Sequence, residues 1–178
     1  KSKLLAEQYI FSKEIPEGKR VYVLRPCMIH GPGNKGNMNL LYGFASKGLP
    51  YPMAAYQNQR SFLSVDNLSF VIKELLIYKV PSGVYNVSDD QALSTNQVIE
   101  LMAHSLNTKP KLLAVPKRII NAIARMGDHL KLPINSERLN KMTENYVVSN
   151  HKIKTAIQKE LPLSVQQGLL ITFNSFKK

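Results

Sequence analysis

The sequence predicts an α/β protein, in which short strands alternate with helices along the chain. Two apolar runs of strand length, at 21–24 and 84–87, have the character of buried parallel strands. Between and after them, apolar residues recur at intervals of three and four, which is the spacing of an amphipathic helix. This alternation is typical of a sheet whose faces are covered by helices.

The first part of the chain is predicted to hold a helix, a strand, a loop and a second helix. Leu5 and Tyr9 form an i, i+4 pair with no capping residue ahead of them, so we expect the natural protein to continue upstream. Gly18 ends this helix and the first strand follows. A loop punctuated by glycines and prolines is expected over 26–39, and a helix from about 40 to 46.

A short strand at 60–65 is expected to lead into a helix capped by Asp66. After the strand at 84–87, Ser94 and Gln97 have the spacing of a capping box for the next helix. The predicted apolar faces are Leu68, Val71, Ile72, Leu75 and Leu76 in the first of these helices, and Val98, Ile99, Met102 and Leu106 in the second.

The remaining elements are predicted as a strand at 112–115 and helices near 117–131, 136–144, 150–158 and 164–176. The helix at 117–131 has two interpretations, a membrane-surface helix or a core-facing helix with a basic outer face, and we favour the second. Its apolar residues are Ile119, Ile120, Ile123 and Leu130, and its basic residues are Lys117, Arg118, Arg125 and Lys131.

Composition limits the class of protein. No run approaches the ~18 to 20 apolar residues of a membrane span. The single cysteine, Cys27, cannot form an internal disulfide, which favours a reducing, cytoplasmic compartment, and no Cys/His spacing indicates a metal site. The net charge of +12 suits nucleic acid, an anionic membrane or phosphorylated ligands. Because the basic residues are spread along the whole chain, we favour solvated helix faces over a nucleic-acid groove.

The first residues, Lys-Ser-Lys-Leu-Leu-Ala-Glu at 1–7, resemble the stretch that follows the active-site tyrosine of the extended short-chain dehydrogenase/reductase family, Tyr-Gly-x-Ser-Lys-x-x-Ala-Glu. The resemblance makes Lys3 the motif lysine and places the tyrosine two positions ahead of Lys1, outside this chain. Residues i and i+4 share a helix face, so the ammonium can lower the pKa of the phenol below its usual ~10. Tyr9 and Lys13 repeat the spacing without the flanking residues, and we interpret them as helix packing.

The segment Leu-Arg-Pro-Cys-Met-Ile-His-Gly-Pro-Gly at 24–33 resembles the family's Leu-Arg-Pro-x-x-x-x-Gly-Pro-Gly, which passes beside the nicotinamide. Met28 departs from the asparagine that many relatives carry there and that contacts substrate phosphate. Cys27 is interpreted as a packed thiol and His30 as a structural residue. Together with Lys3, the cofactor contacts that the resemblance implies are Pro26, Cys27, Met28 and Ile29.

Other motifs resemble the family's substrate-binding elements. Asn39 and Leu40 match a pair that binds the diphosphate, although Asn39 taken alone reads as an ordinary N-cap. Arg60, in Arg-Ser-Phe-Leu-Ser-Val-Asp-Asn, matches the arginine that grips the diphosphate, for which a guanidinium fork is suited. Arg138 is placed like a second phosphate-binding arginine, and a solvent-facing arginine is equally compatible with its position. Tyr51 and Met53 fall where relatives cradle the nucleotide base.

The resemblance covers essentially the whole chain. It implies the C-terminal part of a Rossmann-type doubly wound parallel sheet plus a smaller mixed α/β substrate-binding region. Residues 1–34 would end the dinucleotide-binding domain, and 35–178 would form mainly the substrate-binding region, with 66–90 returning to the sheet. The late segments 85–88 and 147–152 resemble the family's Tyr-Asn-x-Gly/Ser element and its Ser-x-Lys ending.

The implied activity is C4 epimerisation of a nucleotide-diphosphate sugar, UDP-linked, with NAD (NADP possible), as in the UDP-glucose/UDP-galactose 4-epimerases of polysaccharide biosynthesis. The full-length protein is expected to be a homodimer, and residues 1–178 alone are expected to be inactive. A 4-ketoreductase or 4,6-dehydratase of the same family is the alternative. An alternative of another class is a non-enzymatic basic binding module; no nucleic-acid partner, membrane span or metal is expected.

Overall fold

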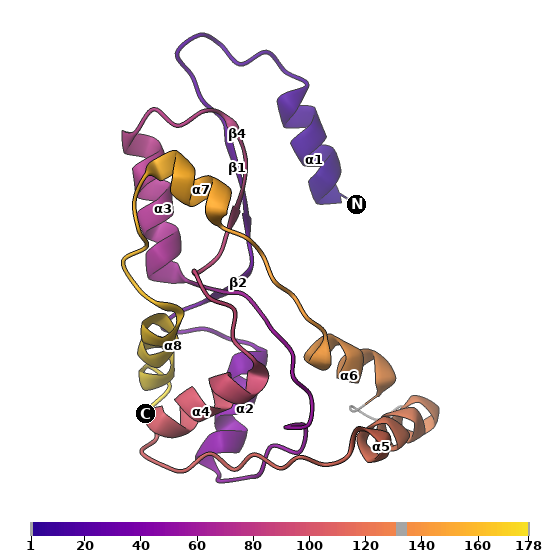
Figure 1. Ribbon diagram of the computed structural model, residues 1–178. Helices are drawn as coiled ribbons and strands as arrows, with labels where there is room; N and C mark the ends of the chain where they lie inside the picture. The colour runs from indigo at the N-terminus through magenta and orange to yellow at the C-terminus, as the bar shows by residue number, and fades with distance from the viewer. Residues whose placement is uncertain (1, 131–134, 178) are drawn as a thin grey trace.

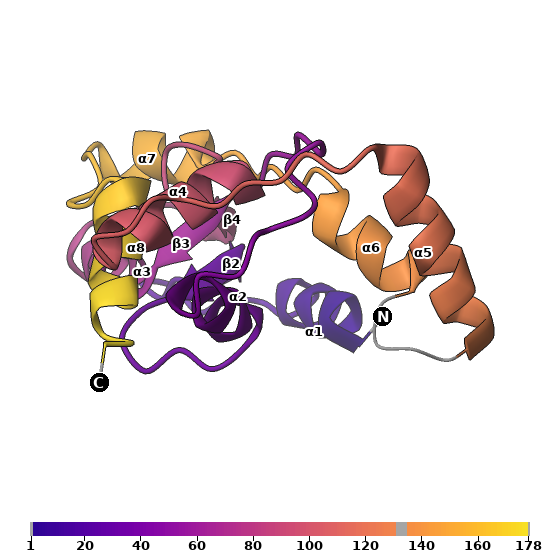
Figure 2. The ribbon, with the colours of Figure 1, turned by 90° about the horizontal axis from the view of Figure 1, so that it is seen from below.

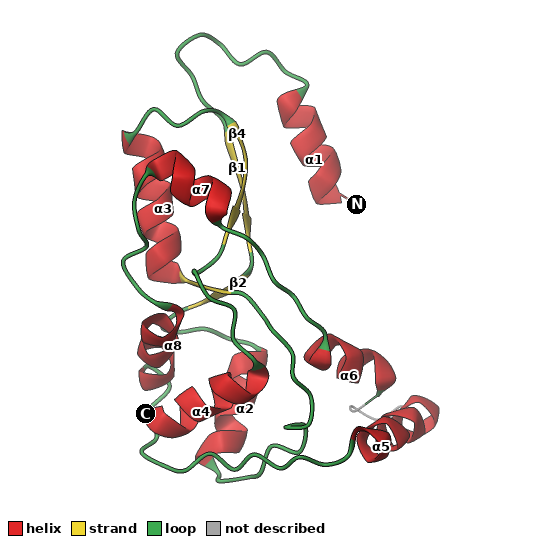
Figure 3. Ribbon diagram, viewed as in Figure 1, coloured by secondary structure: helices red, strands yellow, loops and turns green. Residues whose placement is uncertain are grey.

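Within the residues that the structure describes, four short strands form two parallel pairs. β1 (Tyr22–Pro26) pairs with β4 (Gly83–Val87), which lies beside it in Figure 3, and β2 (Met28–His30) pairs with β3 (Phe62–Ser64). The computed structural model describes residues 2–130 and 135–177. Parallel strands separated by helices confirm the predicted α/β class. The helices of the described residues are α1 (Ser2–Phe11), α2 (Asn37–Ser46), α3 (Val65–Ile77), α4 (Thr95–Ser105), α5 (Lys117–Leu130), α6 (Ser136–Thr143), α7 (His151–Ile157) and α8 (Val165–Asn174).

Among the described residues, the helices pack around three separate apolar cores, and Figure 1 shows how these helices are arranged. In the first, α3 and α7 cover the β1–β4 pair with buried residues such as Val71, Val87 and Ile153. The second lies among α2, α4 and α8, where Met102 and Phe173 are fully buried. The third is small and joins α5 to α6.

Helix α1 stands apart from these cores (Figures 1 and 2). It has no buried residue, and Leu5 and Tyr9 are 61% and 64% exposed. Its link to the body is an ion pair between Glu7 and Arg25, on β1. No helix of the described residues is long and apolar enough to cross a membrane.

The expected loop over 26–39 is wrong in part, because Met28–His30 form β2 and the strand β1 itself extends to Pro26. β2 has only three residues, too few for a periodicity that would reveal it in the sequence. Helix α2 begins at Asn37, earlier than predicted, with Gly36 at the N-cap. Asn39 therefore lies in the first turn and is not the N-cap.

The cap predicted for α3 is also corrected. Ser64 is its N-cap and accepts a hydrogen bond from the Asn67 N–H at 3.1 Å, whereas Asp66 lies in the first turn. The strand ends at Ser64 and the helix begins at the next residue, so the serine hydroxyl reaches the free N–H first. Of the predicted face, Val71 and Leu75 are buried. The outer members, Ile72 and Leu76, are 42% and 78% exposed.

Helix α4 agrees with its prediction. The Gln97 N–H donates to the Ser94 hydroxyl at 3.2 Å, and the Ser94 N–H donates to Gln97 Oε1 at 2.8 Å, which completes the capping box. Val98, Ile99 and Met102 are buried on its inner face.

The elements that follow α4 differ from expectation in two respects. The strand predicted at 112–115 is reduced to single bridges, Tyr51 to Leu112 and Met53 to Ala114. In α5, the predicted core-facing stripe is wrong for three of its four members. Ile120 is buried, but Ile119, Ile123 and Leu130 are exposed. Residue 131 of that predicted helix lies outside the described residues.

A buried polar cluster joins β2, α3 and α8. His30 Nδ1 lies 2.9 Å from the Thr172 hydroxyl, and its other ring nitrogen lies 3.7 Å from Asp89 Oδ2. Asp89 accepts a 2.7 Å hydrogen bond from the Asn67 side-chain amide. The same amide donates to the Leu163 carbonyl at 2.9 Å and accepts from the Leu163 N–H at 3.1 Å. These groups are buried, and the hydrogen bonds of His30 with Thr172 and of Asn67 with Asp89 and Leu163 help to hold α8 against the strands.

Gly168→Ala is expected to destabilise the protein by about 1–3 kcal/mol, as overpacking of a filled core does. A Cβ atom there would lie 2.8 Å from Ser64 Cβ and 3.3 Å from His30 Cε1. The matched control is Gly43→Ala in α2, where a Cβ meets nothing within 4 Å and is expected to stabilise by ~0.5–1 kcal/mol through helix propensity. Urea unfolding measures both, and equal effects of the two variants would contradict this packing.

Candidate functional site

The backbone of Arg60 is held from two sides just before β3. Its N–H donates to the carbonyl of Leu93 at 2.9 Å, and its own carbonyl accepts from the Leu93 N–H at 2.9 Å. On the other side Arg60 bridges to Tyr146, and the next residue, Ser61, donates to the Tyr146 carbonyl at 2.8 Å. This segment therefore runs between the start of α4 and the chain that follows α6, and Arg60 has little freedom to move.

The guanidinium of Arg60 faces α6, and not all of its N–H groups are hydrogen-bonded to the described residues. Its Nη1 donates to the carbonyl of Lys141 at 2.7 Å. Its Nε is buried and meets no acceptor among the described residues. Buried donors are almost always hydrogen-bonded, so the unpaired Nε marks Arg60 as an arginine whose hydrogen-bonding capacity the described residues do not use fully, and a guanidinium fork is suited to an anion. Arg138 is exposed one turn before Lys141 on the same helix, so Arg60 contacts the helix that carries the second predicted arginine.

Tyr51 and Met53 lie in the chain segment that precedes Arg60. Tyr51 is half-buried and exchanges hydrogen bonds with 111–113. Burial raises the pKa of its phenol to about 12, against a smaller lowering by a hydrogen bond with Thr95. Met53 packs against the small core of α5 and α6, which contains Leu139. Both side chains therefore belong to the part of the molecule that also holds Arg60 and Arg138.

Lys3 lies in α1 with its side chain exposed. The helix is fastened to β1 through Glu7, which accepts two hydrogen bonds from the guanidinium of Arg25, one of them 3.1 Å from Nε to Oε1. The hydrogen bond and the charge of Arg25 lower the pKa of Glu7. Both residues belong to sequence motifs of the predicted cofactor site, and their pairing joins the helix of Lys3 to the strand that ends at Pro26.

The predicted cofactor-flanking residues divide into two kinds. Pro26, Met28 and Ile29 are exposed, Met28 by 38% and Ile29 by 41%. Cys27 instead points into the core with Val87, whose carbonyl accepts its N–H at 3.1 Å. Cys27 is therefore a packed thiol, as predicted. Its side chain is not exposed beside Pro26, Met28 and Ile29, so it does not contact a cofactor bound there.

Cys27 is expected to react with Ellman's reagent at pH 8 roughly a thousandfold more slowly than an exposed thiol while the protein is folded. Burial, with a smaller contribution from the charge of Asp89, raises the pKa of this thiol to about 12, so almost no thiolate forms. Unfolding in guanidinium chloride should release one reactive thiol per chain. Fast modification of the native protein would contradict the buried position.

Asn39 and Leu40 lie in the first turn of α2, and Leu40 is 67% exposed. No side chain caps this helix. The positive end of α2 therefore remains available to an anion, in keeping with the predicted role of the pair.

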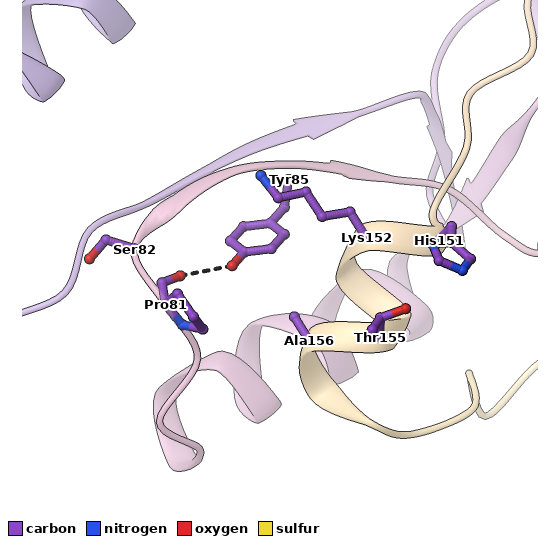
Figure 4. A pocket seen from close by; sticks show the side chains of 7 residues that line it. All are labelled: Pro81, Ser82, Tyr85, His151, Lys152, Thr155 and Ala156. Carbon is purple, nitrogen blue, oxygen red and sulfur yellow. Dashed lines mark hydrogen bonds between the residues drawn. The ribbon is translucent and has the colours of Figure 1, made fainter.

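An open pocket of about 470 Å³ lies elsewhere, between α7 and the start of β4 (Figure 4). Tyr85 donates to the carbonyl of Pro81 at 2.8 Å, and Lys152 donates to the carbonyl of Val84 at 2.8 Å. The Lys152 ammonium also lies 4.7 Å from the centre of the Tyr85 ring. None of the predicted site residues lines this pocket. The candidate site is therefore the region of Arg60, where the predicted substrate-binding residues gather.

Two residues that support this region were not found from the sequence. Asn58 is buried beside Arg60 and donates from its amide to the Thr95 hydroxyl at 3.0 Å and to the Met142 carbonyl at 3.1 Å. Asp89 accepts hydrogen bonds from the Ser64 N–H at 3.3 Å and the Asn67 amide at 2.7 Å, so it holds the end of β3, the strand that follows Arg60. Its position two residues after the parallel strand β4 was the signal available, because carboxyl ends of such strands commonly carry functional residues.

The sequence has relatives among nucleotide-sugar enzymes. It is 29% identical over 177 residues to a UDP-glucose 4-epimerase of Vibrio cholerae, covering 98% of this chain and 52% of that protein. It is 29% identical to a GDP-6-deoxy-D-mannose reductase of Pseudomonas aeruginosa, covering 74% and 46%. It is 31% identical to an N-acetyl-α-D-glucosaminyl-diphospho-ditrans,octacis-undecaprenol 4-epimerase of Escherichia coli O157:H7, covering 65% and 36%. The chain thus spans about half or less of these relatives, and it matches no protein-family model.

Solved structures share the fold. A UDP-N-acetylglucosamine 4-epimerase of Bacillus cereus superposes with a TM-score of 0.69 at 16% identity, over 99% of this chain and 54% of that one. The Bordetella bronchiseptica enzyme WbmG, solved with NAD and UDP, gives 0.66 at 17% identity, over 96% and 47%. The structure of RMD from Pseudomonas aeruginosa, solved with NADPH, gives 0.65 at 21% identity, over 99% and 54%.

The chain therefore has the α/β architecture of the Rossmann-fold epimerases, as the sequence predicted. By their names, its sequence relatives are two 4-epimerases and a reductase, matched over 65–98% of the chain, and its structural neighbours include a 4-epimerase matched over 99% of it. These findings agree with the resemblance to the extended short-chain dehydrogenase/reductase family.

Proposed function

We propose that this chain forms the substrate-binding region of an NAD(P)-dependent enzyme that epimerises a UDP-linked sugar at C4. Residues 1–34 would end its dinucleotide-binding domain and 66–90 would return to the sheet of that domain. The observation that carries the proposal is Arg60, whose backbone is held on both sides and whose buried Nε has no partner among the described residues.

The ligand that Arg60 would bind is a diphosphate. The three relatives act, by their names, on UDP-glucose, on a GDP-linked deoxysugar and on a sugar carried by a diphospho-undecaprenol, so a diphosphate-linked sugar is common to all three. The guanidinium of Arg60 would bond its oxygens, with Arg138 as a second donor, and Asn39 and Leu40 would present the start of α2.

The exposed residues near β1 fit a nicotinamide cofactor. Met28 and Ile29 are both exposed next to Pro26, and because neighbouring residues of a strand face opposite sides, one of the two offers an apolar side chain against which a flat ring can pack. Lys3 is exposed on the helix tied to β1. NAD, when bound, would accept and return the hydride. Lys3 would bind the nicotinamide ribose and hold down the pKa of a tyrosine two positions ahead of Lys1 in the longer protein, so that the phenolate can take the proton of the sugar hydroxyl.

The same residues would also serve a 4-ketoreductase, a reaction type represented by the GDP-6-deoxy-D-mannose reductase, or a 4,6-dehydratase. The exposed apolar residues of α1, Leu4, Leu5 and Tyr9, support a homodimer that buries this helix in the full-length protein. A basic binding module without enzymatic activity is the alternative that the net charge of +12 supports.

The test is conversion of UDP-glucose and UDP-N-acetylglucosamine by the full-length protein, followed by proton NMR. We expect the 4-epimer to accumulate with catalytic NAD and no net cofactor consumption, and we expect residues 1–178 alone to bind UDP without turnover. Stoichiometric loss of NADPH would favour the ketoreductase. Binding of any polyanion with strong salt dependence, without UDP binding or turnover, would contradict the proposal in favour of the basic module.

A further inference from the structure

Helix α5 carries an apolar stripe that no other part of the described chain covers. Ile119, Ile123, Met126 and Leu130 are 51%, 49%, 61% and 64% exposed. Their spacing of four, three and four residues places them on one line along the helix. The contact of α5 with the rest of the protein uses a different face of the helix, on which Ile120 and Ala124 pack against Leu139 of α6. The exposed stripe is therefore a second apolar face and not a part of the core.

Basic side chains lie beside this stripe. Arg118 and Arg125 are both exposed and are seven residues apart, so they share one side of the helix, about 120° round from the centre of the stripe. Neither forms a salt bridge within residues 2–130 and 135–177. The acidic residue of the helix, Asp128, accepts hydrogen bonds from the N–H and hydroxyl of Ser136 at 2.8 and 2.6 Å. These hydrogen bonds and, to a smaller extent, the charge of Arg125 lower the pKa of its carboxyl. The two arginines outnumber this one carboxylate, so the net charge that they and Asp128 present is positive.

The helix also occupies an accessible position. In both ribbon views α5 lies at the far side of the molecule from α3 and α8, with α6 on its inner side (Figures 1 and 2). The helix therefore lies at the edge of the described part of the chain, away from the second core.

We propose that α5 docks on the surface of an anionic lipid bilayer. The helix would lie in the plane of the interface, with Ile123 and Met126 in the acyl boundary and Arg118 and Arg125 among the phosphate headgroups, a combination in which apolar burial and charge attraction add. A second copy of the chain is a poorer occupant, because two such faces in contact would bring the arginines of both copies together without compensating acids on the stripe. The charge of the whole chain, +12, has the sign that such a surface attracts.

Vesicle co-sedimentation of the full-length protein tests this docking. With vesicles of three parts phosphatidylcholine to one part phosphatidylglycerol, we expect binding that is lost with phosphatidylcholine alone. Ile123→Ser with Met126→Ser should weaken binding at least tenfold, because each residue loses most of its buried apolar contact. Arg118→Gln with Arg125→Gln should weaken it about 30-fold, at ~1 kcal/mol for each basic residue near the surface.

The matched control is Leu76→Ser on α3, which removes an even more exposed side chain, at 78%, from a helix outside the proposed surface. It should leave vesicle binding unchanged. None of these variants should alter the circular dichroism or the mass in solution. Equal binding to both kinds of vesicle, unchanged binding of the α5 variants, or a loss of self-association in the Ile123→Ser, Met126→Ser protein would each overturn the proposal. Vesicle binding needs no sugar substrate, so its outcome is independent of the proposed enzymatic activity.

Discussion

In the full-length protein, Lys3→Ala is expected to lower kcat on a UDP-sugar by about 10²–10⁴-fold, the range found when a proton-transfer step loses its tuned acid or base. Without the ammonium, the pKa of the neighbouring phenol returns towards ~10. The loss should therefore diminish at high pH, where more phenolate forms, and the pH–rate profile should shift upward. Steady-state kinetics between pH 6 and 10, with NAD supplied in excess, measure both effects.

Lys13→Ala is the matched control for this variant. Lys13 has the same spacing from Tyr9 that Lys3 would have from the upstream tyrosine, and its ammonium lies 4.8 Å from the centre of the Tyr9 ring. Both belong to the exposed N-terminal region, so general effects on folding should be equal. We expect Lys13→Ala to retain nearly all activity. If the two variants were equally impaired, or if Lys3→Ala were fully active, the assignment of Lys3 would be wrong.

Arg60→Ala is expected to weaken UDP binding by about 10- to 150-fold, which corresponds to the 1.5–3 kcal/mol of a hydrogen bond to a charged group. The reason is that the variant removes the unpaired Nε together with the rest of the guanidinium fork. Arg60→Lys should recover only part of the loss, because an ammonium cannot reproduce the planar pair of donors. Isothermal titration of the full-length protein with UDP measures these affinities.

A structural effect of Arg60→Ala must be separated from a binding effect, since Arg60 Nη1 also donates to the Lys141 carbonyl. Arg20→Ala is the control, because Arg20 likewise donates from Nη1 to a backbone carbonyl, that of Tyr78, at 3.4 Å. It should lose a similar contact and keep its affinity for UDP. Unchanged UDP affinity in Arg60→Ala would show that this arginine is structural only.

The sequence predicted those elements whose signals are local. The Ser94 and Gln97 capping box and the apolar strands at 21–24 and 84–87 depend on neighbours in the chain, and the structure has all of them. β2 was missed because its pairing partner, β3, is about thirty residues away and both strands are only three residues long. The predictions of which helix residues are buried were only half correct. Periodicity identifies the apolar residues of a helix but cannot tell which of them will contact another element. Ile72 and Ile123, for example, were predicted to be buried and are exposed.

The candidate site was predictable in its residue types and less so in its assembly. Arg60 was selected by its motif, but its restraint by Leu93 and Tyr146 depends on contacts across 33 and 86 positions of the chain. The ion pair of Glu7 with Arg25 joins two motifs that the sequence presents separately. Long-range contacts of this kind leave no trace in spacing or composition, and only the folded chain reveals them.

The sequence of the gene immediately upstream of the codon for Lys1 is the most direct test of the role given to Lys3. We expect Tyr-Gly directly before Lys1, which puts the tyrosine four positions ahead of Lys3, and a glycine-rich strand-to-helix turn roughly 130 to 150 residues earlier. Any other residue in place of that tyrosine would contradict the catalytic role of Lys3. The absence of both features would leave Arg60 as an anion-binding residue in a protein that is not a nucleotide-sugar epimerase.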